Sequence, residues 1–220
     1  MPRRKVFLVN EEIYHVYNRS VAQQSIFSLE NEGWRFLQLL DFYRFVENPL
    51  RFSYYLKLSN KRKDEYLSRL YFSKARVEIY GFCLMPNHYH LEIKQKEDGG
   101  ISDFIRIVEN SYARYFNLKQ KRQGAVFQSP FKAERIESKE DAIHVLRYIH
   151  LNPLTSFVIK KPEELENYLW TSFMDYMSVN PRHLINTNFF LDMFGDKQEF
   201  AKFCLNQVEY QRELGRIKEF

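Results

Sequence analysis

Two histidines separated by one residue are the side chains of this chain best suited to chemistry. His88 and His90 follow the turn-like sequence Met-Pro-Asn at residues 85–87. If the residues after this turn form a strand, its two-residue period places both imidazoles on one face and Tyr89 on the other. Two imidazoles on one face can bind one divalent metal ion. Hydrogen-bonded or solvated strand histidines explain the same pair, so a metal site needs support from elsewhere in the chain.

The segment that follows Ser138 carries the signals of a helix. Two acidic residues, Glu140 and Asp141, come directly after Ser138, which predicts an N-cap serine with acidic side chains in the first turn. We expect the helix to end at residue 151 or 152, because Pro153 disfavours helical geometry in the residue before it.

Polar side chains line one face of this predicted helix. His144, Tyr148 and Asn152 follow one another at intervals of four residues, so they align on one face. A boundary face, on which the tyrosine packs its ring and shows its hydroxyl to water, explains the row equally well. The neighbouring face is apolar and should pack on a sheet; it consists of Ala142, Val145, Leu146 and Ile149.

The composition is that of a globular protein that could bind an anionic partner. The chain has 220 residues, of which 45% are hydrophobic and 28% charged, and its net charge is +5. This balance excludes a disordered chain. The 33 Lys and Arg residues can neutralise phosphates, and the 15 Tyr and 20 Phe residues offer stacking faces for bases. An aromatic core beneath a solvated basic surface is the alternative explanation.

No membrane or secretion signal is visible in the sequence. No apolar run approaches the length of a membrane span, and the start Met-Pro-Arg-Arg-Lys leads into no apolar core. Cys83 and Cys204 lie far apart in apolar segments, which favours buried thiols over a disulfide. We therefore expect a cytoplasmic protein.

The order of predicted elements indicates an α+β fold. Strands are expected at 13–18, 76–84 and 88–94, and an extended segment at 125–137. Helices are expected at 31–46, at 102–117 with Ser102 as N-cap, and after Ser138. Residues 51–72 have helical tendency only at 63–70. The hairpin at 76–94 suits a mainly antiparallel sheet with helices packed on it.

The chain changes character after Lys160-Lys161-Pro162. Short helical segments are expected at 168–179, 189–194 and 197–214. We interpret residues 1–160 as one domain and residues 161–220 as a helical C-terminal extension.

Several blocks of the sequence together resemble one enzyme family. The segment Met-Pro-Asn-His-Tyr-His at 85–90 resembles the His-hydrophobic-His signature of the HUH single-strand DNA endonucleases. The segment Arg-Tyr-Ile-His-Leu-Asn-Pro at 147–153 resembles the tyrosine helix of their single-tyrosine transposases. Blocks at 14–19, 111–117 and 127–132 follow the same order, and Trp-Thr-Ser-Phe at 170–173 resembles the REP-associated tyrosine transposases. The family implies a ferredoxin-like antiparallel sheet with helices packed on one face.

The resemblance implies a role for each half of the site. His88 and His90 would hold a divalent metal, Mg²⁺ or Mn²⁺, with the carbonyl oxygen of Asn152 as third ligand. Imidazole ligands on their own suit Mn²⁺, Zn²⁺, Co²⁺ or Ni²⁺ better than Mg²⁺. Tyr148 would attack a phosphodiester of single-stranded DNA and form a 5′-phosphotyrosine link. The family also implies hairpin-bearing DNA as the target.

The sequence departs from the family in one loop. Ser129-Pro130 stands where many relatives contain glycine, so the path of this loop and its DNA contacts are open, whereas the metal and tyrosine positions are unaffected.

Other tyrosines and histidines compete for these roles. Tyr112 and Tyr115 lie near the apolar side of the predicted helix at 102–117, so we expect them to pack. His144 is either a proton carrier beside Tyr148 or a boundary histidine. His150 should point away from the polar row, and no role is assigned to it.

Basic residues on the predicted loops and strands are candidate phosphate contacts, and each could equally be a solvated surface charge. They are Arg19, Lys119, Lys121, Arg122, Lys132 and Arg135.

Two other function classes fit parts of the pattern. A non-catalytic ferredoxin-like nucleic-acid-binding module explains the aromatic residues and the charge, but not the recurrence of histidines, tyrosine and asparagine. A metal-dependent phosphohydrolase that uses activated water explains His88, His90 and Asn152, but not Tyr148. Either a monomer or a homodimer is compatible with the sequence.

Overall fold

Four antiparallel strands form the centre of the fold in the computed structural model, which describes residues 6–208. The strands are β1 (Ile13–Arg19), β2 (Val77–Met85), β3 (His88–Gln95) and β4 (Lys132–Ile136). Their order in the sheet is β2-β3-β1-β4, and every neighbouring pair is antiparallel. This order, with a helix in each of the two crossovers, is the ferredoxin-like topology that the sequence predicts.

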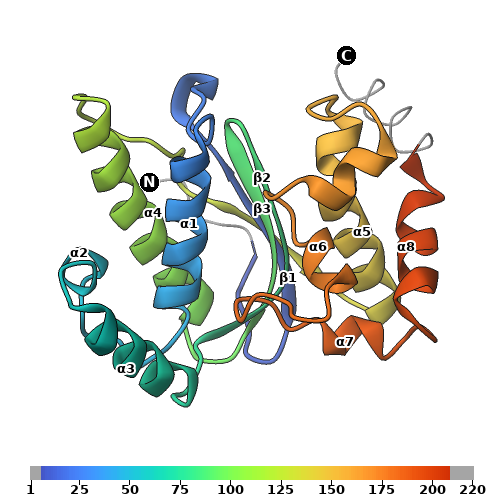
Figure 1. Cartoon of the computed structure of the whole chain (residues 1–220), viewed down its shortest axis with the longest axis horizontal. Helices are drawn as coiled ribbons and strands as arrows, with labels where there is room; N and C mark the ends of the chain where they lie inside the picture. The colour runs from blue at the N-terminus through green and yellow to red at the C-terminus, as the bar shows by residue number, and fades with distance from the viewer. Residues whose placement is uncertain (1–5, 209–220) are drawn as a thin grey trace.

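The two crossover helices cover one face of the sheet. α1 (Glu30–Tyr43) and α4 (Gly100–Lys119) lie side by side on this face, to the left of the sheet in Figure 1. Tyr89, on β3, is fully buried beneath them and its ring contacts Phe36 of α1. The 51–72 segment, which sequence patterns left largely unplaced, forms α2 (Phe52–Tyr55) and α3 (Asn60–Tyr71).

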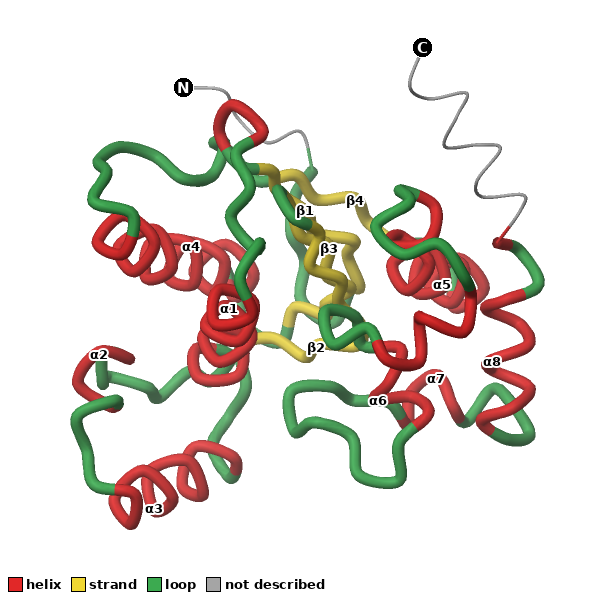
Figure 2. The backbone as a smooth tube through the Cα atoms, turned by 45° about the horizontal axis from the view of Figure 1, so that its top comes forward, coloured by secondary structure: helices red, strands yellow, loops and turns green. Residues whose placement is uncertain are grey.

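A second layer of helices covers the opposite face, in addition to the single layer that we expected. It begins with α5 (Lys139–Thr155), which packs on β2 and β3; Figure 2 shows the sheet between the two layers. The cause lies in β2 and β3, whose residues are buried on both faces and therefore need cover on both. The remaining elements are η1 (Val21–Gln23), η2 (Pro162–Asn167), α6 (Phe173–Met177), α7 (Asn188–Leu191) and α8 (Lys197–Leu205).

The boundaries of α4 and α5 differ from the sequence prediction. α4 begins at Gly100, two residues before the expected cap Ser102, because Gly99 takes a left-handed conformation with φ of 68°. α5 has the predicted cap, in which the Ser138 hydroxyl accepts from the backbone N–H of Asp141 at 2.9 Å. It continues two residues past Pro153 to Thr155, and the burial of residues 149–154 accounts for this continuation.

The residues after 160 pack into the same hydrophobic core as the sheet. Thr171 forms a bridge with Cys83 of β2, and the backbone N–H of Ser172 donates to the carbonyl of Phe82 at 3.0 Å. The last predicted helix, 197–214, corresponds to α8, and its end beyond residue 208 lies outside the described residues. Both cysteines are buried and unpaired. Among the described helices, none has the length and apolarity needed to cross a membrane.

Candidate active site

The β2–β3 hairpin fixes the position of the two histidines. Backbone hydrogen bonds from residues outside the hairpin fix its tight turn. The carbonyl of Pro86 accepts from the backbone N–H groups of Ile26 and Phe27 at 2.7 and 3.0 Å. The carbonyl of Asn87 accepts from Ser20 in the same way at 2.8 Å. The first residue after the turn is His88, so the histidine pair begins the return strand as predicted.

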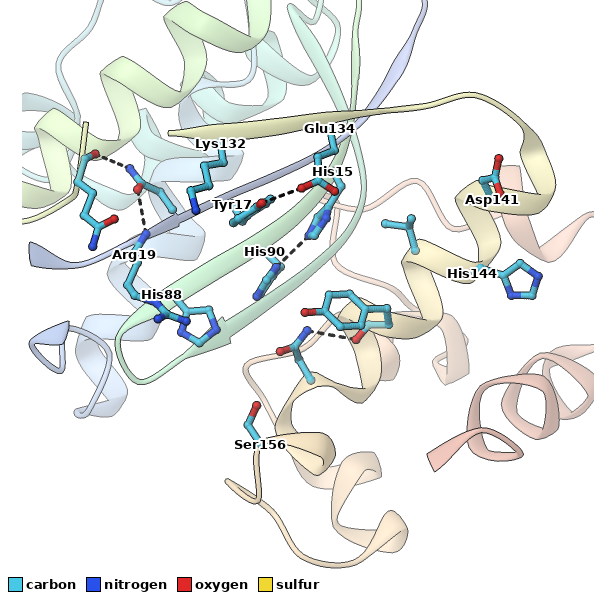
Figure 3. A pocket seen from close by; sticks show the side chains of 15 residues that line it. His15, Tyr17, Arg19, His88, His90, Lys132, Glu134, Asp141, His144 and Ser156 are labelled. Carbon is cyan, nitrogen blue, oxygen red and sulfur yellow. Dashed lines mark hydrogen bonds between the residues drawn. The ribbon is translucent and has the colours of Figure 1, made fainter. Parts of the chain in front are cut away.

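A cleft of about 750 Å³ opens between the sheet and α5, and it contains both predicted halves of the site. Figure 3 shows its lining side chains, which come mainly from β1, β3, β4 and α5. The lining residues are His15, Tyr17, Asn18, Arg19, His88, His90, Gln128, Lys132, Glu134, Asp141, His144, Val145, Tyr148, Asn152 and Ser156.

The imidazole of His88 is held in one tautomer. Its Nδ1 lies 2.6 Å from the side-chain oxygen of Asn87. Because a carbonyl oxygen can only accept, Nδ1 carries the proton and Nε2 keeps its lone pair. Burial, with a smaller effect from the charge of Arg19, lowers the pKa of His88 to about 4. The side chain is therefore neutral at pH 7, as a metal ligand must be.

His90 is more deeply buried and is bonded to a third histidine. It is 6% exposed, and its Nδ1 lies 2.9 Å from Nε2 of His15. The two rings stack with centroids 5.1 Å apart and an interplanar angle of 17°. Burial, with smaller effects from neighbouring His15, His88 and Arg19, holds the pKa of His90 well below its usual range.

The tyrosine and asparagine of α5 face this histidine cluster. The Tyr148 ring meets the His90 ring edge-on at a centroid distance of 5.7 Å, and 39% of its surface is exposed. Asn152 is 4% exposed, and its Nδ2 donates to the backbone carbonyl of Tyr148 at 3.3 Å. This bond uses the amide nitrogen and leaves the side-chain oxygen as the acceptor available to a ligand.

These donors suit a divalent cation with open coordination positions. Nowhere in residues 6–208 do three or more His, Cys, Asp or Glu side chains gather in a metal-binding cluster. The donors in the cleft are instead two neutral imidazole nitrogens and one amide oxygen, from His88, His90 and Asn152. Three protein donors leave positions for water or substrate oxygen, which is the pattern of a catalytic site.

The six basic residues proposed as phosphate contacts separate into two groups. Arg19 and Lys132 line the cleft, and neither forms an ion pair with another residue in the described part of the chain. The other four lie outside it: Lys119 is paired with Glu32 at 3.0 Å, Arg135 is paired with Glu12 at 2.7 Å, Arg122 donates to Gln24 at 2.9 Å, and Lys121 is exposed.

The competing aromatic and histidine side chains lie elsewhere or are otherwise bonded. Tyr112 is fully buried and donates its hydroxyl to the carbonyl of Ile26, and Tyr115 packs against the Arg35 guanidinium. His144 lies at the rim of the cleft, where its Nδ1 is 2.8 Å from Arg147 Nη2.

His150 points away from the cleft, as the helix period predicts. It is fully buried, and its Nε2 lies 2.8 Å from the Ser172 hydroxyl.

Among the cleft residues that received no individual role from the sequence are His15, Tyr17 and Glu134. The Tyr17 hydroxyl donates to Oε1 of Glu134 at 2.7 Å. Burial and the neighbouring Glu134 carboxylate raise the pKa of Tyr17 to about 12, so its hydroxyl stays protonated. The signal was present, because His15, Tyr17 and Arg19 alternate along β1 and must share a face.

The cleft coincides with a region that matches a known protein family. The family model described as "Transposase IS200 like" matches residues 54–152. The matched segment contains His88, His90, Tyr148 and Asn152. This segment of the chain is similar to the IS200-like transposases. No curated protein matches the chain.

A solved structure confirms the fold. The chain is similar to a REP-associated tyrosine transposase bound to a REP hairpin, with a TM-score of 0.54 and 14% sequence identity. The similarity covers 80% of this chain and 86% of the other. It covers a larger share of the chain than the 54–152 segment that matches the family model.

Proposed function

We propose that this protein is a transposase that acts as a metal-dependent endonuclease and strand transferase for single-stranded DNA, with Tyr148 as its nucleophile. The observation that carries the proposal is the position of the partly exposed Tyr148 against the buried, neutral imidazole of His90, in a cleft that the half-buried, neutral His88 also lines. These side chains come from segments about 60 residues apart in the chain, and the fold brings them together.

The proposed reaction is a transesterification. The phenolic oxygen of Tyr148 attacks phosphorus and loses its proton, and the bond between phosphorus and the 3′ oxygen breaks. The departing oxygen takes up a proton and becomes a 3′-hydroxyl, and the phosphate stays joined to Tyr148 and to the 5′ carbon of the downstream strand. The covalent link conserves the phosphoester for rejoining.

His88, His90 and Asn152 would hold Mg²⁺ or Mn²⁺ in the cleft. When bound, such an ion supplies positive charge that polarises a phosphate and stabilises the charge of its transition state. The protein's own contribution is to keep both imidazoles neutral and to keep their Nε2 atoms free of other partners.

Arg19 and Lys132 would contact the phosphates of the DNA strand. Both are exposed and line the cleft. Because the solved transposase of similar fold is bound to a REP hairpin, we extend the proposal to hairpin-bearing DNA for this chain.

A denaturation-resistant adduct tests the proposal. Protein is incubated with Mn²⁺ and a hairpin-bearing oligonucleotide labelled at its 3′ end, and denatured samples are separated. The 3′ label should remain on the protein, whereas a 5′ label should be released with the 3′-hydroxyl fragment. Tyr148→Phe should abolish the adduct and keep DNA binding. Tyr54→Phe removes an exposed phenol outside the cleft and should change nothing.

Three other outcomes would contradict the proposal in different ways. An adduct that persists in Tyr148→Phe would place the nucleophile on another residue. Nicking by Tyr148→Phe without an adduct would indicate a phosphohydrolase. Binding without nicking in the presence of Mn²⁺ or Mg²⁺ would indicate a non-catalytic module.

A further inference from the structure

We propose that His15 is a positioning residue that holds His90 in the tautomer whose Nε2 is free to bind a metal. This inference rests on the proposed function of the cleft. His15 lies on β1 and is not one of the proposed metal ligands. Its proposed role is to orient one of them, His90.

Only one of two arrangements of the His15–His90 pair allows metal binding. Two neutral imidazoles with Nε2 of His15 at 2.9 Å from Nδ1 of His90 share one proton between these atoms. If His15 donates, the proton of His90 must sit on Nε2, which then has no lone pair for a metal. If His90 donates from Nδ1, its Nε2 is a free donor atom.

The strand pairing favours the arrangement in which His90 donates. His15 lies directly opposite Glu134 of β4, and Figure 3 shows the two side chains beside each other. Residues opposite each other on neighbouring strands have their Cβ atoms about 4.5–5.5 Å apart. The Glu134 carboxylate is an acceptor that already binds the Tyr17 hydroxyl. β4 and β3 lie on opposite sides of β1. A negative charge on the β4 side of His15 stabilises a proton on its Nδ1, so its Nε2 is left to accept from His90.

Burial makes the pair an effective constraint. His15 and His90 are 8% and 6% exposed, so water cannot replace the bond between them at low cost. The neighbouring ligand His88 is controlled by a different device, the carbonyl oxygen of Asn87. A metal ligand's second nitrogen usually donates to a carboxylate, a carbonyl or water. Here the acceptor is an imidazole, which can exist in either tautomer. The charge of Glu134 favours the tautomer of His15 that accepts.

The tautomer can be read directly in the metal-free protein. With ¹⁵N-labelled histidine, NMR correlations identify the protonated nitrogen of each ring, and His90→Gln assigns the His90 signals. We expect His90 to be protonated at Nδ1 and His15 at Nδ1. Protonation of His90 at Nε2 would overturn the inference, whatever the activity of the enzyme.

Metal affinity provides the second test, in a series of variants at His15. His15→Phe keeps an aromatic ring in the stack and removes the acceptor, so Mn²⁺ should bind about 10–100-fold more weakly. His15→Gln restores an acceptor oxygen near the place of Nε2, and its Mn²⁺ affinity should return to within about threefold of wild type. His183→Phe is the matched control, because His183 is exposed and stacks on Tyr71 outside the cleft. Circular dichroism confirms that each variant is folded.

The outcomes separate this inference from the proposed function. If folded His15→Phe binds Mn²⁺ as wild type does, while His88→Ala does not bind, the inference is wrong and the metal site stands. If wild type and His88→Ala bind Mn²⁺ equally, the metal site itself is wrong. Equal weakening in His15→Phe and His15→Gln would assign His15 a packing role and overturn the inference.

Discussion

At the scale of single residues, the site depends on which atom of each side chain is left without a partner. Asn87 bonds Nδ1 of His88, His15 bonds Nδ1 of His90, and the Tyr148 carbonyl bonds Nδ2 of Asn152. Each bond uses the nitrogen that a metal does not need. The three remaining donor atoms belong to residues that line one cleft.

Removing these donors one at a time should weaken metal binding to different extents. His88→Ala and His90→Ala should each lower Mn²⁺ affinity at least about 100-fold, because a site with three protein donors loses an imidazole. Asn152→Ala should cost less, because water can replace a neutral oxygen donor. Isothermal titration with Mn²⁺ measures all three, with His183→Ala as the control. Equal affinities across the series would contradict the assignment.

At the scale of elements, β3 contains two of the proposed metal ligands and also a buried carboxyl group that lowers the stability of the fold. Its two-residue period puts His88, His90 and Glu92 on one face. Glu92 is fully buried, and neither of its carboxylate oxygens has a hydrogen-bond partner among the described residues. Burial raises the pKa of Glu92 well above its usual range, which favours the uncharged form of this side chain.

Replacing Glu92 by an apolar residue of similar shape should stabilise the fold. Glu92→Met removes a buried polar group without partners, so the free energy of unfolding should rise by about 1–3 kcal/mol. Glu92→Gln keeps a buried polar group and should give little or no gain. Urea unfolding at pH 7 measures both variants. A less stable Glu92→Met would show that the carboxyl makes a favourable contact in the folded protein.

At the scale of the whole molecule, both halves of the site come from one chain. Only residues 137 and 138 separate β4 from α5, and two extended residues span about 7 Å. Such a short connection keeps α5 packed on the sheet of the same chain. The C-terminal residues also contact this helix. Arg147 of α5 packs over the Phe203 ring of α8, with the guanidinium carbon 4.4 Å from the ring centroid.

This arrangement predicts that inactive variants cannot complement each other. A mixture of Tyr148→Phe with the double variant His88→Ala, His90→Ala should remain as inactive in nicking as either alone. If two chains exchanged α5, about a quarter of the sites in a random dimer mixture would regain both halves. Recovered nicking in the mixture would therefore indicate an active site shared between chains.

The sequence predicted the parts of the molecule that depend on local patterns. The strand period placed His88 and His90 on one face of a strand. The i+4 spacing after the Ser138 cap placed Tyr148 and Asn152 on one face of a helix. The helix after Ser138 and the C-terminal helical segments were predicted, but their arrangement as a second layer was not, because the face of the sheet that a helix covers depends on tertiary packing. The alternation along β1 could have placed His15 on the face of the site. Its contacts with His90 and Glu134 depend on strand pairing, and Glu134 lies 119 positions away in the chain.

The identity of the residue that carries the DNA is the most direct test of the central claim. The covalent adduct formed with wild-type protein and a short oligonucleotide is digested with trypsin, and mass spectrometry locates the modified residue. The account predicts a phosphodiester-linked nucleotide on Tyr148, in the peptide that follows Arg147, with the phosphate on the 5′ side of the nucleotide. DNA attached to Tyr17 or any other residue, or attached through a 3′-phosphate, would contradict it.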